Sequence, residues 1–184
     1  SAASDVYKRQ VIAYDGIAVV LNPANAVDGL TTEQVKDIFE GKITNWSEVG
    51  GADQAIIVVT REAGSGTRGA FEEILKLLDD NKASTIVDTA LVSEGTGAVM
   101  ATVATKEAAI GFISLGYMDE TVKSITIDGV EPTVKTVKAN EYKISRPLLL
   151  VSQPTIKAEA QGVIDFIIGD KGQEIMSEKY ISIN

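Results

Sequence analysis

The sequence predicts an α/β fold whose sheet is largely parallel. Segments rich in apolar and β-branched residues alternate along the chain with segments of helical periodicity, which is the pattern of strands joined by helices. Residues 56–60 form a short continuous apolar run, as expected of a strand that is covered on both faces. The chain has 184 residues, 45% of them hydrophobic, which is enough for one sizeable domain or two small lobes.

Strands are expected where apolar runs end at turn residues. The first spans residues 11–21, with a break near Asp15 and Gly16, and Pro23 follows it. Residues 1–10 are polar and aperiodic, so we interpret them as a leader or an expression remnant. The remaining strands are predicted at residues 56–60, 110–113, 122–127 and 144–152, the last interrupted by Pro147.

Helices are expected where apolar residues recur every three or four positions. Thr31 and Gln34 form a capping box, and Gly41 lies where a left-handed residue would end a helix within residues 30–41. An apolar stripe from Phe71 to Leu78 predicts a second helix. Further helices are predicted after a Gly-rich turn at residues 94–97, ending near Lys106, and at residues 161–168 and 172–180.

The segment 61–67, Arg-Glu-Ala-Gly-Ser-Gly-Thr, is predicted to bind an oxyanion. It lies between an expected strand and an expected helix, whose first N–H groups lack intrahelical partners and carry the positive end of the helix dipole. Gly64 and Gly66 let the main chain approach a ligand, and Ser65 and Thr67 supply hydroxyl groups. Arg61 brings a guanidinium fork that matches paired oxygens.

Each part of this segment also has a structural interpretation. Ser65 or Thr67 can be a plain helix cap. Arg61 can pair on the surface with one of three nearby carboxylates: Glu62, Glu72 or Glu73. Arg68 is expected to be solvated, and the turn at residues 94–97 is interpreted as a structural cap, since it has no adjacent Arg and starts with a carboxylate.

Composition excludes several classes of function. The net charge of −9 argues against non-specific nucleic-acid binding, and any anion must be held locally against that field. The absence of Cys and His excludes the usual zinc sites and nucleophilic mechanisms built on these residues. No apolar run approaches the roughly 18–20 residues of a membrane helix, and no signal peptide is recognisable. We expect no metal, no cofactor and no nucleic-acid partner.

Residues 61–68, followed by Phe71, Glu72 and Glu73, resemble the phosphate-binding loop of periplasmic phosphate-binding proteins. These proteins are the substrate-binding components of ABC phosphate importers. Three other segments resemble the crossover strand and two further signatures of the family: residues 15–23, 30–46 and 109–112. The resemblance runs from about residue 11 to the C-terminus.

The resemblance implies a periplasmic-binding-protein type II fold with a three-layer lobe and a mixed sheet. Residues 11–143 would form the second lobe with the crossover strand, and residues 144–184 would belong to an incomplete first lobe. The phosphate contacts carried over from the family are Arg61, Ser65, Gly66 and Thr67. The implied role is transport without chemistry, with inorganic phosphate and the membrane permease of an ABC importer as partners. The implied location is extracellular or periplasmic, at the cell envelope, with a signal or lipid anchor outside this chain.

The resemblance also implies a half-site. In the family, the acceptor that recognises the phosphate proton belongs to the lobe part that residues 1–10 do not match, so we expect weak phosphate binding and poor discrimination against sulfate. Some members hold the arginine with an acidic residue where Ala63 stands here, and Glu62 can substitute for it. Apolar surface around residues 11–21 and 144–152 is expected to drive homodimerisation or exchange of elements.

Two other classes of function stay open at this level. The chain can be the ligand-sensing lobe of a receptor or regulator. It can also be an enzyme that uses the loop as an oxyanion hole, with Glu62 or Asp15 as the base.

Overall fold

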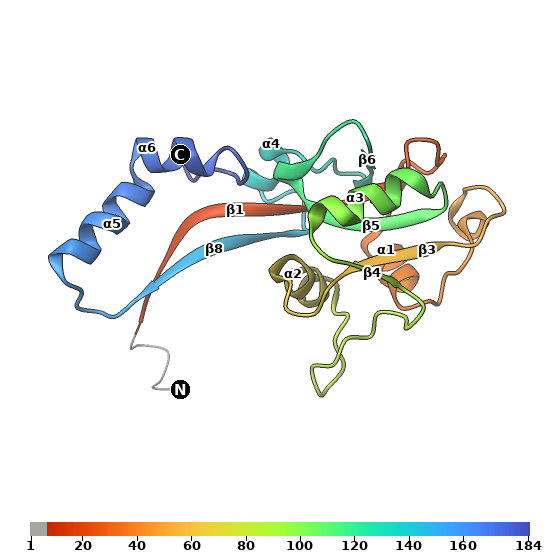
Figure 1. Ribbon diagram of the computed structural model, residues 1–184, viewed down its shortest axis with the longest axis horizontal. Helices are drawn as coiled ribbons and strands as arrows, with labels where there is room; N and C mark the ends of the chain where they lie inside the picture. Colours follow the sequence, from red (N-terminus) through yellow and green to blue (C-terminus); the bar gives the residue numbers. More distant parts are fainter. Residues whose placement is uncertain (1–6) are drawn as a thin grey trace. The chain divides into compact units, whose positions relative to one another are not determined.

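The computed structural model describes residues 7–184, which form two compact units. The larger unit is Gly16–Ser145, and the smaller unit joins the residues up to Asp15 with Arg146–Asn184. Helices and strands alternate in the larger unit, which confirms the predicted α/β class (Figure 1). Within the described residues, no helix has the length and apolar character needed to cross a membrane.

The main sheet has the strand order β4-β3-β5-β1-β6, and β8 also pairs with β1. β3 is parallel to both β4 and β5, whereas β1 is antiparallel to β5 and β6. The sheet is therefore mixed, as predicted, and its β4-β3-β5 part is parallel. The strands are β1 (Lys8–Leu21), β3 (Ile57–Arg61), β4 (Leu91–Ser93), β5 (Ala109–Ser114), β6 (Lys123–Ser124) and β8 (Ser145–Ser152).

Helices cover both faces of the parallel strands, which gives the larger unit three layers (Figure 1). On one face, Phe112 of β5 stacks on Phe71 of α2 (Gly66–Leu75) at 4.0 Å between ring centroids. Phe39 of α1 (Thr32–Phe39) meets Phe71 edge-on at 4.9 Å. On the other face, Ile113 packs with residues of α3 (Thr96–Thr105). Successive side chains of β5 thus pack against the helices on opposite faces of the sheet, as the pleat of a strand requires.

The caps of α1 follow the sequence closely. The Thr31 hydroxyl accepts the Gln34 N–H, and the Gln34 side chain accepts the Thr31 N–H, so the predicted capping box is confirmed. Gly41 has φ +73° and follows the helix end. The end of α2 was predicted wrongly, because the helix stops at Leu75 and leaves Leu78 outside. Lys76 takes the left-handed conformation there, and a non-glycine residue gives no sequence signal for such a stop.

Three strand predictions also need correction. β1 starts at Lys8 and runs without a break. Gly16 is needed for close packing and not for a turn, because a Cβ there would lie 3.0 Å from Val137 Cγ2. Residues 1–6 of the predicted leader lie outside the described residues. Residues 122–127 form two short strands that pair differently, β6 with β1 and β7 (Thr126–Ile127) with β2 (Gly29–Leu30). β8 continues through Pro147.

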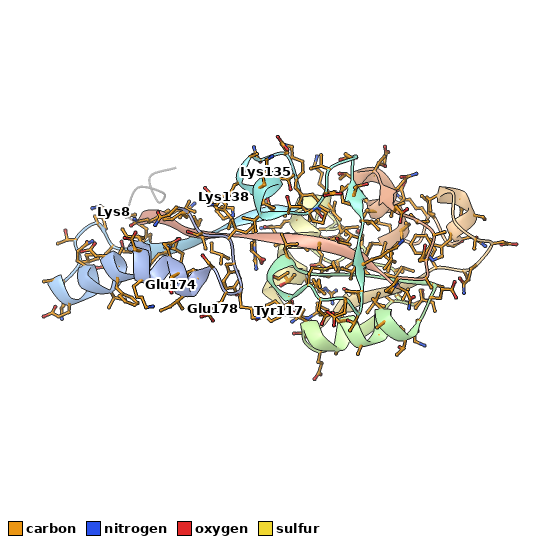
Figure 2. All side chains as sticks on the ribbon, turned by 90° about the horizontal axis from the view of Figure 1, so that it is seen from above. Lys8, Tyr117, Lys135, Lys138, Glu174 and Glu178 are labelled. Atoms are coloured by element: carbon orange, nitrogen blue, oxygen red, sulfur yellow. The ribbon has the colours of Figure 1, made fainter. Side chains whose placement is uncertain are left out.

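Short helices complete the larger unit. The sole tryptophan, Trp46, begins a 3-10 helix (Trp46–Val49) that Asn45 caps, and its indole N–H donates to the Ala108 carbonyl at 2.9 Å. A second 3-10 helix spans Leu115–Tyr117. In α4 (Val134–Lys138), Lys135 and Lys138 project from the last turn, where the helix dipole favours cations (Figure 2).

The smaller unit is organised around a buried glutamine. Gln173 lies in α6 (Asp170–Met176), which starts and ends earlier than the predicted 172–180, and α5 (Ala158–Ile168) precedes it. The Gln173 amide donates to the carbonyls of Ile12 and Ile167 and accepts from Ile183 N–H and the Ser182 hydroxyl. All four hydrogen-bonding positions of the amide are thus used. On the outside of α6, Glu174 pairs with Lys171 (Figure 2). Both side chains are exposed, so the pair contributes little to the stability of the fold.

The tight packing between β5 and α3 can be tested with Gly111→Ala. The added Cβ would lie 2.9 Å from Val99 Cγ1 and 3.1 Å from Val103 Cγ2, so overpacking should cost about 1–3 kcal/mol. Gly69→Ala in α2 is the control, because its Cβ meets no atom within 4 Å and should stabilise the helix by about 0.5–1 kcal/mol. Urea unfolding followed by Trp46 fluorescence measures both. Equal stability of G111A and wild type would contradict the packing described.

Candidate oxyanion-binding site

The site lies where two neighbouring parallel strands end. β3 and β4 pair in the register Val59 with Leu91, Thr60 with Val92 and Arg61 with Ser93. Parallel strands end at the same edge of a sheet, so the loops after Arg61 and Ser93 leave side by side. Each loop leads into a helix of ten residues, α2 or α3, and both helix N-termini lie at this edge (Figure 1).

The loop after β3 has the local structure that the sequence predicts. Gly64 has φ +85°, a conformation that favours glycine, and turns the chain toward α2. Ser65 is the N-cap, and its hydroxyl accepts the Arg68 N–H at 3.3 Å. Gly66 and Thr67 are then the first two helical residues, at the positive end of the helix dipole. No atom lies within 4 Å of a Cβ built at Gly64 or Gly69, so there is open space next to the main chain here.

Arg61 is held at the end of β3 by two residues. Its Nε and Nη2 donate to the two carboxylate oxygens of Glu62, both at 2.8 Å. Its Nη1 donates to the Thr96 hydroxyl at 3.3 Å. The Arg61 side chain is 11% exposed and that of Glu62 is 34% exposed, so the guanidinium is the more buried partner of the pair. Of the three carboxylates considered from the sequence, Arg61 pairs with Glu62.

The pair changes the acidity of Glu62. Hydrogen bonds from the Arg61 guanidinium, then from the backbone N–H groups of Glu62 and Gly95, lower the pKa of the carboxyl from 4.5 to about 2. The Gly95 N–H donates to Oε2 at 3.2 Å. Glu62 is therefore an anion at every physiological pH, engaged by a guanidinium and by the main chain of the next loop.

The prediction of a solvated Arg68 is wrong. Its Nε donates to Glu72 at 2.8 Å along α2, and its Nη1 donates to the Arg61 carbonyl, also at 2.8 Å. The side chain is 19% exposed. The unfavourable position of a cation in the first helical turn is thus offset by an acidic residue one turn later. Arg68 therefore links α2 to the end of β3.

The turn at residues 94–97 starts α3, in line with its interpretation as a structural cap. Gly95 is the N-cap of α3, with φ +84°, and no side chain caps this helix. The turn also contacts the loop after β3. The Gly95 N–H donates to the Glu62 carboxylate, and the Thr96 hydroxyl accepts a hydrogen bond from Arg61. No local sequence pattern indicates these contacts, because they depend on the pairing of β3 with β4. Gly95 and Thr96 are residues of the site that the sequence did not reveal.

Asp15, the other candidate base, belongs to the smaller unit. It is buried, at 2% exposure, and pairs with Arg146 at 3.4 Å. Glu62 and Asp15 each therefore have a cationic partner in their own unit.

Comparison with known proteins relates this architecture to a transport family. A family model described as a PBP superfamily domain matches residues 2–171. A putative phosphate ABC transporter substrate-binding protein from Clostridium perfringens, solved with bound phosphate, is 42% identical with a TM-score of 0.84, over 97% of this chain and 72% of that chain. An ABC-type phosphate transport receptor from Vibrio cholerae is 38% identical with a TM-score of 0.92, over 97% and 74%.

Two curated relatives have similar names. The phosphate-binding protein PstS of Borreliella burgdorferi is 28% identical over 181 residues, which cover 94% of this chain and 64% of that protein. The phosphate-binding protein PstS of Bacillus subtilis is 33% identical over 153 residues, which cover 83% of this chain and 48% of that protein. The chain thus spans about half to two thirds of the length of these relatives.

The pKa of Glu62 gives a direct test of the pair. In the folded chain its carboxyl carbon should titrate by NMR with a midpoint near 2, and Arg61→Ala should move the midpoint up toward 4.5. Arg9→Ala, which removes an exposed arginine, should not. Because the folded-state pKa is lowered, the stabilisation from the pair is present above the ordinary pKa and is lost as the pH falls toward 2. A wild-type midpoint near 4.5 would contradict the pairing.

Proposed function

Because the chain belongs to the PBP superfamily, and within it to the phosphate-binding proteins of ABC transporters, we propose that it captures inorganic phosphate for an ABC-type importer. The observation that carries this proposal is the Arg61 guanidinium, held by Glu62 and Thr96 at the sheet edge where α2 and α3 begin. The similarity to a substrate-binding protein solved with bound phosphate, at 42% identity, supports phosphate as the anion.

The proposed contacts are Arg61, Ser65, Gly66 and Thr67. Arg61 supplies charge-assisted hydrogen bonds, which are shorter and stronger than neutral ones. Gly66 and Thr67 bring main-chain N–H groups at the positive end of α2, and the hydroxyls of Ser65 and Thr67 can donate to further oxygens. These contacts would hold an anion by local charges and dipoles even in a protein with a net charge of −9.

The wider role follows from the same proposal. The chain would work outside the cytoplasmic membrane, at the cell envelope, and deliver phosphate to the permease of the importer. Residues 11–143 would form the phosphate-binding second lobe, and residues 144–184 would belong to the first lobe.

A catalytic role has less support, because the candidate bases are engaged. Glu62 is bonded by Arg61 and has a pKa of about 2, too low for a general base near neutral pH. Asp15 is paired with Arg146. We therefore propose binding without chemistry, and hydrolysis of a generic phosphate ester by the purified chain would contradict it.

Arg61→Ala tests the site. Hydrogen bonds to a charged group contribute about 1.5–3 kcal/mol, so the variant should bind phosphate at least about tenfold more weakly. Titration followed by amide NMR suits millimolar affinities and reports the position of binding at Gly66 and Thr67. Arg9→Ala removes the same charge from an exposed strand end and should bind as wild type does. Unchanged binding by R61A would refute the assignment.

The same titration with sulfate tests selectivity. Phosphate near neutral pH carries a proton and sulfate does not, so discrimination needs an acceptor in the site. The proposed contacts of this unit are donors, and the nearby Glu62 carboxylate is already bonded to Arg61 and Gly95. We therefore expect weak phosphate binding that sulfate displaces at similar concentration. Tight binding that excess sulfate leaves intact would contradict this.

We also propose that the chain forms a homodimer through the smaller unit. Large apolar side chains are exposed there, among them Val163 at 59%, Phe166 at 54% and Ile175 at 50%. Sedimentation velocity should show a dimer that Phe166→Lys weakens. Val92→Lys, which changes an apolar residue of the larger unit exposed by 63%, is the control. A monomer at high concentration would contradict the proposal.

A further inference from the structure

The larger unit has a cavity of about 220 Å³ at the end of β3 opposite to Arg61. Residues from three segments line most of it: 41–44 after α1, 56–58 at the start of β3, and 87–91 before and within β4. β3 runs over five residues from Ile57 to Arg61, so the cavity lies roughly 13 Å along the strand from the proposed oxyanion site. A ligand in the cavity would therefore not compete with phosphate for the same contacts.

Main-chain hydrogen bonds tie the three walls of the cavity to one another. The Val87 N–H donates to the Phe39 carbonyl at 2.8 Å, which joins the segment before β4 to the end of α1. The Ile56 N–H donates to the Thr44 carbonyl, also at 2.8 Å, and β3 and β4 are joined by their parallel pairing. A Cβ at Gly41 would lie 2.9 Å from Val87 Cγ2, so these two walls also meet directly. The cavity is therefore preformed, as small-molecule sites usually are.

The lining of the cavity is apolar at its base and polar at its mouth. Most of the lining consists of branched aliphatic side chains, among them Ile38, Ile43, Ile56, Val58, Val87 and Leu91. Ile38 and Val58 are buried, whereas Thr44 and Thr89 are exposed. The two threonine hydroxyls are thus available to a polar group of a ligand whose apolar body fills the base.

A charged ligand has no partner in this lining. None of the described residues that line the cavity carries a charge, and an ion taken into apolar surroundings is costly unless it is paired. The cation closest in sequence to the lining is Lys42, and it is already paired with Glu40 at 2.6 Å and with Asp37 at 3.3 Å. The net charge of −9 disfavours an anion further. The chemistry of the cavity therefore favours a neutral molecule.

The volume of the cavity sets the size of that molecule. An apolar cavity of about 150 Å³ can stay dry and take up benzene. The present cavity has room for one ring with a short substituent, and it is smaller than the roughly 300–1,000 Å³ of sites for larger ligands. We propose that it is a second binding site of this chain, for a small neutral ring compound with an apolar body and one polar group at the Thr44 and Thr89 hydroxyls.

p-Cresol is a suitable probe, because it is a single ring with a methyl group at one end and a hydroxyl group at the other. Added to the wild-type chain, it should shift the methyl resonances of Ile38, Ile43 and Ile56 saturably, with a dissociation constant of about 1 mM or lower. Its charged analogues, p-toluate and protonated p-methylbenzylamine, should bind at least about tenfold more weakly, since neither ion finds a partner in the lining.

Two results of this titration would overturn the proposal. One is the absence of a saturable shift at these isoleucines, including the case in which only exposed residues such as Ile175 respond. The other is binding of p-toluate or protonated p-methylbenzylamine as tight as that of p-cresol. Phosphate binding at Gly66 and Thr67 is measured separately, so either site can be refuted without the other.

Leu91→Trp tests where the probe binds. Leu91 lines the cavity and is 39% exposed, so a larger side chain there should obstruct the mouth and weaken p-cresol binding about tenfold or more, as small changes of fit do in apolar pockets. Val92→Trp is the matched control. It places the same side chain on the next residue of β4, which is 63% exposed and is not among the lining residues, and should bind p-cresol as wild type does. Equal affinities of L91W and wild type, or an equal loss in both variants, would contradict the proposal.

Ile56→Ala gives the opposite change at the same place. Shortening this side chain enlarges the cavity, so the variant should bind naphthol, a two-ring probe, more tightly than wild type does. Urea unfolding followed by Trp46 fluorescence shows that the variant is folded under the conditions of the titration. Unchanged naphthol affinity in folded I56A would contradict binding in this cavity.

Discussion

The parallel pairing of β3 with β4 is the constraint on which the site depends. It sets Arg61 opposite Ser93, so that two loops and two helix N-termini emerge at one edge of the sheet. The arginine at the end of β3 can then reach Thr96, and Glu62 can reach the main chain of Gly95. A shift of one residue in this register would turn Arg61 to the other face of the sheet and break these hydrogen bonds.

The packing of the layers keeps that register. Phe39, Phe71 and Phe112 fill one face of the sheet, and α3 lies against the other, close enough that Gly111 leaves no room for a side chain. α2 and α3 are therefore fixed against opposite faces, and their N-termini converge because the strands that precede them are neighbours. The proposed anion site is in this sense a consequence of the core: the proposed contact residues are few, but their positions come from buried residues far along the chain.

Local features of the site could be predicted from the sequence, and non-local ones could not. The capping box at Thr31, the Gly64 turn and the Ser65 cap are each specified within a few residues. The partners Gly95 and Thr96 lie more than thirty residues from Arg61 and depend on strand pairing. The predicted strand break at Gly16 is wrong because a glycine needed for close packing looks the same in sequence as one needed for a turn.

A crystal structure of the chain grown with phosphate tests the central claim most directly. The account predicts an oxyanion at the start of α2, within hydrogen-bonding distance of the Gly66 and Thr67 N–H groups and of the Arg61 guanidinium, with Glu62 still bonded to Nε and Nη2. Phosphate bound elsewhere, or bound to Arg61 in place of Glu62, would contradict it.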